Sequence, residues 1–231
     1  MLTPLNNNVN NSHVSFSGGR ILSKLGIRKI DSPKYGINYR KGDIGFTFHK
    51  KSIMASAISY FTRWHRSSHV KVAHSFIVVD ASTCVEALAE NGVHEKSLTD
   101  YFNDKNTIVF FRRPKGITKE IANEIAENAK KEIGKKYANS LIWNMVGRGT
   151  ILGHLIDIFT KNKTFDRQSQ LLNKDGSFLC SELVAHCLQK IQQWPFHNEG
   201  VLKRPAAGIN PQELFEDENI FKPGRIKLSK A

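Results

Sequence analysis

The stretch VAHSFIVVDASTCVEALA, from Val72 to Ala89, decides the fold. Its two halves, 72–79 and 83–89, are rich in β-branched and other apolar residues, and a polar turn around Asp80 separates them. Two such runs on either side of a turn predict a β-hairpin. His74 and Glu86 are twelve residues apart, so a turn centred on a residue places both side chains on one face of the sheet. The hairpin therefore predicts a histidine–carboxylate pair.

Other elements can be predicted outward from this hairpin. Further strands are expected at 43–48, 92–98 and 107–113, and helices at 52–63 and from about residue 118 to residue 133. Thr118 is the expected N-cap of that second helix, and Gly134 its stop. A last helix is expected to start near Cys180, because apolar residues recur there at helical spacing: Leu183, Val184, Cys187, Leu188 and Ile191. This order predicts an α+β fold, with an antiparallel sheet packed against helices.

The domain organisation follows from length and composition. Residues 1–20 are rich in Asn, Ser and Gly, which predicts a flexible polar tail. Residues 21–231 are long enough for one well-buried domain. The N-terminus lacks the pattern of a Sec signal, and no apolar run reaches transmembrane length. These features predict a soluble protein, either cytoplasmic or exported by a non-Sec route as a secreted effector, and at most peripheral to a membrane.

The charge balance indicates the kind of partner. The chain has 34 Lys+Arg against 21 Asp+Glu, a formal net charge of +13. Such a balance favours an anionic membrane or cell-wall surface, and the chain has no zinc-finger, RNP or helix-turn-helix pattern that would favour nucleic acid. The alternative is an ordinary solvated basic surface.

Cys180 is the candidate nucleophile among three cysteines, a count too low and odd for a disulfide framework. At the start of a helix, a thiol meets the positive end of the helix dipole and unpaired backbone N–H groups, which favour the thiolate. The alternative is a buried structural cysteine, the role expected for Cys187 two turns further on.

His74 is the candidate general base, because a polar ring that opens an apolar strand is unusual unless it faces a site. Glu86 can orient that ring as the third member of a triad. The alternatives are a satisfied core histidine and a solvent-facing glutamate. His65 and His69 are spaced for metal binding on a helix, but no further ligand is evident, so neither a metal nor a cofactor is expected.

Several short motifs occur in a fixed order and extend this interpretation. They are Gly42-Asp43-Ile44, His74 before an apolar strand, Val85-Glu86-Ala87, Gly92-Val93, Gly134-Lys135-Lys136-Tyr137, Leu179-Cys180-Ser181-Glu182-Leu183-Val184 and Asn210-Pro211-Gln212-Glu213-Leu214. This set resembles the permuted papain-like hydrolases, the YiiX-type relatives of NlpC-type cell-wall peptidases and of lecithin–retinol acyltransferase. The resemblance covers roughly residues 40–220.

The resemblance implies a circularly permuted papain-like fold with Cys180 as nucleophile, His74 as general base and Glu86 as the third polar residue. Tyr137, Ser181 and Trp143 are the candidates for substrate binding. The gap between Tyr137 and Cys180 is long for the family, which implies an apolar insertion near 139–175. No counterpart of papain's oxyanion-hole glutamine is evident.

The expected function is a cysteine acyl hydrolase that forms an acyl-enzyme on an amide, ester or thioester substrate. Two alternatives remain open. The first is an acyltransferase that moves a fatty acyl group to a lysine or a lipid amine, which an apolar surface at 141–159 would suit if that stretch is not core. The second is a binding module on the same fold without catalytic activity.

Overall fold

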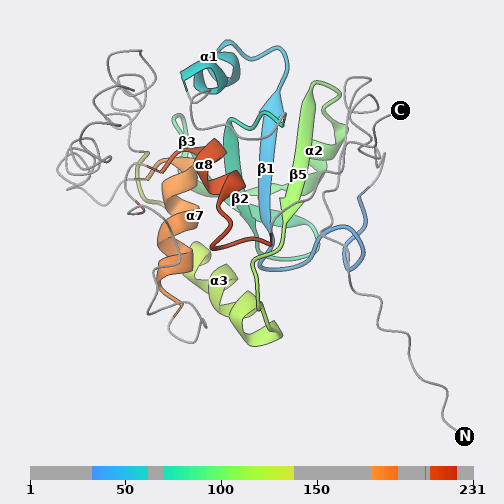
Figure 1. Cartoon of the computed structure of the whole chain (residues 1–231), viewed down its shortest axis with the longest axis vertical. Coiled ribbons are helices and arrows are strands. Elements are labelled where there is room, and N and C mark those ends of the chain that lie inside the picture. The colour runs from blue at the N-terminus through green and yellow to red at the C-terminus, as the bar shows by residue number, and fades with distance from the viewer. Residues whose placement is uncertain (1–32, 62–69, 138–177, 192–205, 207–208, 223–231) are drawn as a thin grey trace, which may run out of the picture.

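The computed structural model of the 231-residue chain describes residues 33–61, 70–137, 178–191, 206 and 209–222 (Figure 1). The predicted tail at 1–20, the insertion near 139–175 with its apolar stretch, and the histidine pair at 65 and 69 lie outside these residues. The described residues contain no helix that is both long and apolar enough to cross a membrane.

A five-stranded antiparallel sheet forms the centre of the structure. Its strands are β1 (Ile44–His49), β2 (His74–Val78), β3 (Thr83–Leu88), β4 (Gly92–Ser97) and β5 (Thr107–Arg112). Their order across the sheet is β4-β3-β2-β1-β5. The prediction of an antiparallel sheet combined with helices is confirmed.

The β2–β3 hairpin turns at Asp80, as the sequence indicates. The Asp80 carboxylate accepts hydrogen bonds from the backbone N–H groups of Ser82 (2.7 Å) and Thr83 (2.8 Å), which closes the turn. Phe76 pairs with Glu86 across the two strands. His74 therefore lies on the same face as Glu86, at a diagonal position, because side chains two apart share a face.

In the described part of the chain, five helices accompany the sheet: α1 (Ile53–Phe61), α2 (Leu98–Asn103), α3 (Lys119–Lys131), α7 (Cys180–Gln189) and α8 (Pro211–Glu216). Helices α3, α7 and α8 lie on one face of the sheet and α2 on the other (Figure 1). The short helices α2 and α8 were not predicted. The strand expected to run to residue 98 ends one residue earlier, because the Ser97 hydroxyl accepts from the Thr99 N–H and begins α2.

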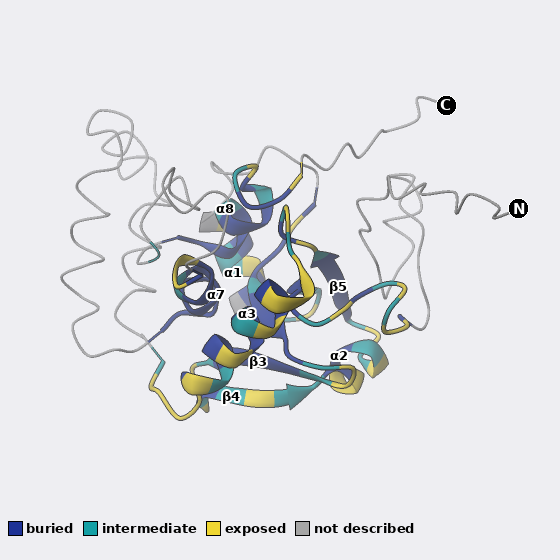
Figure 2. Ribbon diagram, turned by 90° about the horizontal axis from the view of Figure 1, so that it is seen from below, coloured by how far each residue is buried: buried dark blue, intermediate teal, exposed yellow. Residues whose placement is uncertain are grey.

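Each face of the sheet has its own apolar core. The larger core joins the sheet to α3, α7 and α8, and includes Ile44, Phe46, Ile77, Val85 and Leu183. The smaller core packs α2 and Tyr39 against Phe76, Val78 and Phe111. Helix α7 is almost wholly buried, whereas most residues of the edge strand β4 are half-buried (Figure 2).

Helix α3 begins at the predicted cap, Thr118, but ends two residues earlier than expected, and Ile133 is 42% exposed beyond it. Glu132 at its end accepts from the Lys190 ammonium (2.7 Å), and its carboxylate lies 3.3 Å from His186 Nε2 on α7. Burial opposes the charge of Glu132, but hydrogen bonds from Lys135 and Lys190 lower its pKa to about 2. The Glu132 carboxylate therefore links the end of α3 to His186 of α7 and to Lys190 at its C-terminus.

Gly45 leaves room for an aromatic ring on the smaller core. A Cβ at residue 45 would lie 2.0 Å from the Phe76 ring, the cross-strand partner of Gly45. Phe76 in turn stacks on Tyr101 of α2, with ring centroids 4.9 Å apart. A side chain at residue 45 would therefore displace the ring that supports α2.

We expect Gly45→Ala to lower the free energy of unfolding by about 1–3 kcal/mol, because it overpacks a filled core. Urea unfolding should show the loss. Phe76→Leu supplies the matched background, since a smaller side chain leaves room for the methyl group. An equal loss from Gly45→Ala in both backgrounds would contradict this account.

Candidate active site

Cys180 is the first residue of α7 and is 6% exposed. Leu179 is the N-cap in an extended conformation, and its N–H donates to the Glu182 carboxylate at 3.3 Å. The backbone N–H groups of Ser75 and Ser181 donate hydrogen bonds to the Cys180 sulfur. Ser75 pairs with Phe46 in the β1–β2 ladder and lies just before the first pair of the β2–β3 ladder, Phe76 with Glu86.

His74 opens β2 and joins the other two members of the predicted triad. Its Nε2 lies 2.5 Å from Oε2 of Glu86, and its ring is hydrogen-bonded to Cys180. Because Glu86 engages Nε2, Nδ1 is the ring nitrogen that remains for the sulfur. The structure thus brings together all three residues, which lie on β2, β3 and α7.

The pKa shifts of Cys180 and His74 favour a thiolate–imidazolium pair. Burial disfavours both charges, but the attraction between them exceeds this cost. The pKa of the Cys180 thiol is lowered by His74 and by the two backbone N–H donors. The pKa of His74 is raised to about 10 by Cys180 and Glu86. A thiolate is the reactive form of cysteine, so this pair favours the nucleophilic form of Cys180.

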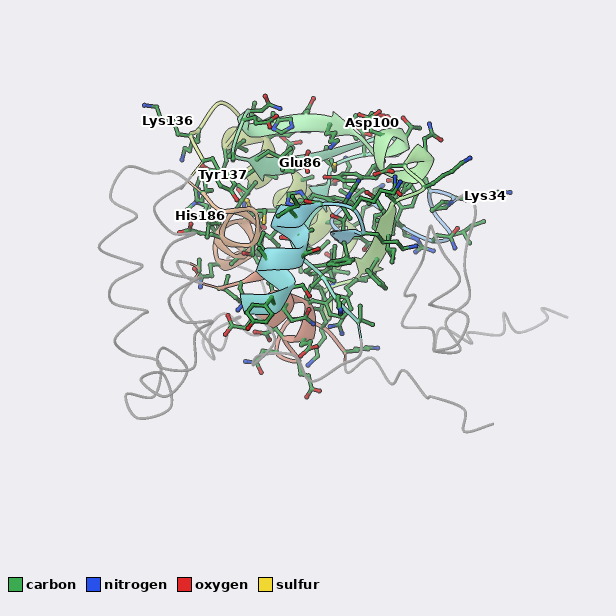
Figure 3. The ribbon with its side chains drawn as sticks, turned by 90° about the horizontal axis from the view of Figure 1, so that it is seen from above. Lys34, Glu86, Asp100, Lys136, Tyr137 and His186 are labelled. Atoms are coloured by element: carbon green, nitrogen blue, oxygen red, sulfur yellow. The ribbon has the colours of Figure 1, made fainter. Side chains whose placement is uncertain are left out.

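Glu86 is fully buried, with 0% exposure, and lies within the sheet (Figure 3). Besides His74, its Oε2 accepts a hydrogen bond from the Tyr101 hydroxyl of α2. Its Oε1 lies 3.4 Å from both His94 Nε2 and Lys96 Nζ on β4. Burial would raise the pKa of Glu86, but His74, Tyr101 and Lys96 lower it to about 2. The carboxylate is therefore charged whenever the thiolate is.

Sequence reasoning missed the contacts of Glu86 with Tyr101, His94 and Lys96. The positions of His94 and Lys96 follow from the β3–β4 register, which pairs Glu86 with His94 and Cys84 with Lys96. Alternation along β4 could have placed both on the Glu86 face. Tyr101 gives no comparable signal, because its contact depends on how α2 folds back onto the sheet.

Tyr137 lies beside α7 (Figure 3), where it forms an isolated bridge with Phe178. Burial and the negative charge of Cys180 raise the pKa of its hydroxyl, which stays protonated as a hydrogen-bond donor. Two motifs far apart in the sequence meet here. The N–H of Val93 donates to the Lys135 carbonyl at 2.8 Å, and a Cβ at Gly92 would lie 2.3 Å from that oxygen.

The other candidates for substrate binding differ from Tyr137. The side chain of Ser181 is buried, and its hydroxyl donates to the Ile209 carbonyl at 2.7 Å. We therefore assign this hydroxyl an anchoring role, whereas the backbone N–H of Ser181 contacts the sulfur. Trp143 lies outside the described residues.

The motif at 210–214 forms α8 and supports both halves of the site. The Gln212 amide accepts from the Val72 N–H and donates to the Val70 carbonyl, each at 3.1 Å. These bonds explain why β2 begins at His74 and not at Val72 as predicted: the backbone before His74 pairs with Gln212. The same motif lies next to Ile209, the partner of Ser181.

The described residues contain no group of three or more His, Cys, Asp or Glu side chains that could hold a metal ion. No protein-family model matches the chain, and no curated protein sequence matches it. The candidate site therefore stands on its geometry and electrostatics.

We expect iodoacetamide to modify Cys180 at neutral pH much faster than Cys84 or Cys187. Burial raises the pKa of both other thiols, that of Cys187 to about 12, so they remain protonated. Each unit of pKa changes the thiolate fraction about tenfold at a pH below the pKa. Peptide mass spectrometry measures all three cysteines in one sample.

His74→Ala removes the partner that stabilises the thiolate, and should slow the alkylation of Cys180 at pH 7 by about tenfold or more. The rates of Cys84 and Cys187 should not change, so they report on the integrity of the fold. Equal rates for Cys180 in the wild type and in His74→Ala would show that the ion pair does not form.

Proposed function

We propose that this protein is a cysteine acyl hydrolase with a circularly permuted papain-like fold. The observation that carries the proposal is the link from His74 to both Cys180 and Glu86. The order of these residues along the chain supports the permuted arrangement, in which the histidine strand precedes the cysteine helix. The antiparallel sheet and the position of Cys180 at the start of α7 also agree with it.

The proposed reaction has two steps. The Cys180 thiolate attacks a carbonyl carbon, and the proton on His74 Nδ1 passes to the leaving group, which leaves an acyl thioester on Cys180. Neutral His74 then takes a proton from water, the hydroxide attacks the thioester, and the acid departs as the thiolate returns. Backbone N–H groups at the start of α7 are the available donors for the developing oxyanion. Glu86 holds the imidazole ring in place throughout.

Cys180→Ala and His74→Ala should each lower kcat by roughly a thousandfold or more, because the members of a triad act as a unit. Glu86→Gln should cost less, since Glu86 orients and does not react. Rates of hydrolysis of amide, ester and thioester donors give kcat. After exposure to each donor, the mass of the peptide that contains Cys180 identifies any acyl group bound to it. Wild-type turnover by Cys180→Ala would refute the mechanism.

The same experiment separates hydrolysis from the two alternatives. If an added amine captures the acyl group in preference to water, the protein is an acyltransferase with the same acyl-enzyme. If no donor leaves an acyl group on Cys180 although iodoacetamide does react, the fold acts as a binding module. Release of the free acid supports the hydrolase.

The partner that we propose is an anionic surface, either phospholipid headgroups or wall polymer. Its support is the net charge of +13. Exposed Lys and Arg near such a surface contribute about 1 kcal/mol each, and this attraction fades within a Debye length.

We therefore expect the protein to co-sediment with anionic phosphatidylserine vesicles or with teichoic-acid-bearing wall fragments at low salt. Binding should fall steeply between about 0.05 and 0.5 M salt, as screening shortens the Debye length. Neutral phosphatidylcholine vesicles are the matched control. Tight binding to nucleic acid, with none to either surface, would show that the charge serves another partner.

A further inference from the structure

The two oxygens of the Glu86 carboxylate face different kinds of partner. Oε2 accepts from His74 Nε2 at 2.5 Å and from the Tyr101 hydroxyl. Oε1 has no hydrogen bond, but it lies 3.4 Å from both His94 Nε2 and Lys96 Nζ. The neutral hydroxyl of Tyr101 and the ring of His74 therefore both contact Oε2. The side chains of His94 and Lys96 on β4 lie near Oε1.

The position of the Tyr101 hydroxyl is fixed by the core around its ring. The ring stacks on Phe76 at 4.9 Å with an interplanar angle of 10°, and Tyr101 is 8% exposed. The Lys96 ammonium lies 4.3 Å from the ring centroid. Because the ring has no freedom to follow Glu86, the hydroxyl is an anchor to which the carboxylate must adjust.

We propose that Tyr101 is a positioning residue, whose hydroxyl holds Oε2 of Glu86 against His74 and opposes the pull of His94 and Lys96 on the carboxylate. This inference rests on the proposed function. The terminal torsion of a glutamate is broad and roughly two-fold, so a carboxylate without a fixed donor rotates easily. A partial turn of the carboxylate plane, or a shift of the group toward β4, would weaken its contact with the imidazolium of His74.

The titratable and charged groups that face Glu86 come from several elements. They come from β2 (His74), β3 (Cys84), β4 (His94 and Lys96) and α2 (Tyr101), and Cys180 of α7 acts through His74. Burial and the charge of Glu86 raise the pKa of Tyr101 well above 10. The hydroxyl consequently keeps its proton throughout the range in which Cys180 forms its thiolate.

The test is the pH dependence of Cys180 alkylation by iodoacetamide, which needs no acyl substrate. Tyr101→Phe keeps the stacked ring and removes only the hydroxyl. The acid limb of the rate profile should move to higher pH by about one unit, which is a tenfold loss of rate within the limb. Tyr35→Phe removes a hydroxyl from an exposed ring and is the matched control, with an unchanged limb.

A second substitution tests the direction of the effect. Adding Lys96→Met to Tyr101→Phe removes a competing cation and keeps an apolar stem over the ring, so the limb should return toward the wild-type position. A purely structural role for Tyr101 would lower Tm without moving the limb. An unmoved limb in Tyr101→Phe, or no return in the double variant, overturns the positioning role.

Two further outcomes are distinguishable. If wild-type Cys180 alkylates with the pH profile of an ordinary thiol, the ion pair is absent, and both the proposed function and the role of Tyr101 fail. If the Tyr101→Phe chain does not fold, the single variant Lys96→Met tests whether Lys96 competes for Glu86. The limb should then stay or move to lower pH, and a move to higher pH would show that Lys96 supports the pair and does not compete for Glu86.

Discussion

A buried negative charge is the constraint on which the rest of the structure depends. Glu86 has no exposed surface, and a carboxylate in such a place costs several kcal/mol unless charged or hydrogen-bonding partners surround it. Those partners come from three other elements: His74 on β2, His94 and Lys96 on β4, and Tyr101 on α2. Satisfying this one charge therefore requires contributions from β2, β4 and α2.

Glu86 acts on the buried thiol of Cys180 through His74. Glu86 stabilises the imidazolium, and the imidazolium stabilises the thiolate at the start of α7. Two contacts beyond Cys180, His74 and Glu86 hold the elements that carry these residues. Gln212 of α8 binds the backbone before His74, and Glu132 holds α7 against α3. Residues more than a hundred positions apart thereby form one electrostatic unit.

Much of the secondary structure could be predicted, because its signals are local. The five strands, the helix capped by Thr118 and the helix starting at Cys180 all follow from apolar spacing, turns and caps. The six-residue helices α2 and α8 were missed, since an element of that length shows little periodicity. The sheet order was beyond reach as well: β5 pairs with β1, across more than fifty residues of chain.

By itself, the sequence determined the hairpin and the shared face of His74 and Glu86. A turn and the two-residue period of a strand fix that relation locally. It also marked Cys180 as a residue at a helix start. Only the tertiary structure decided that the sulfur reaches His74, and that Tyr101 shares an oxygen of Glu86. Those contacts depend on how α7 and α2 dock on opposite faces of the sheet. Docking follows from the packing of many side chains in the two cores, which no local sequence pattern encodes.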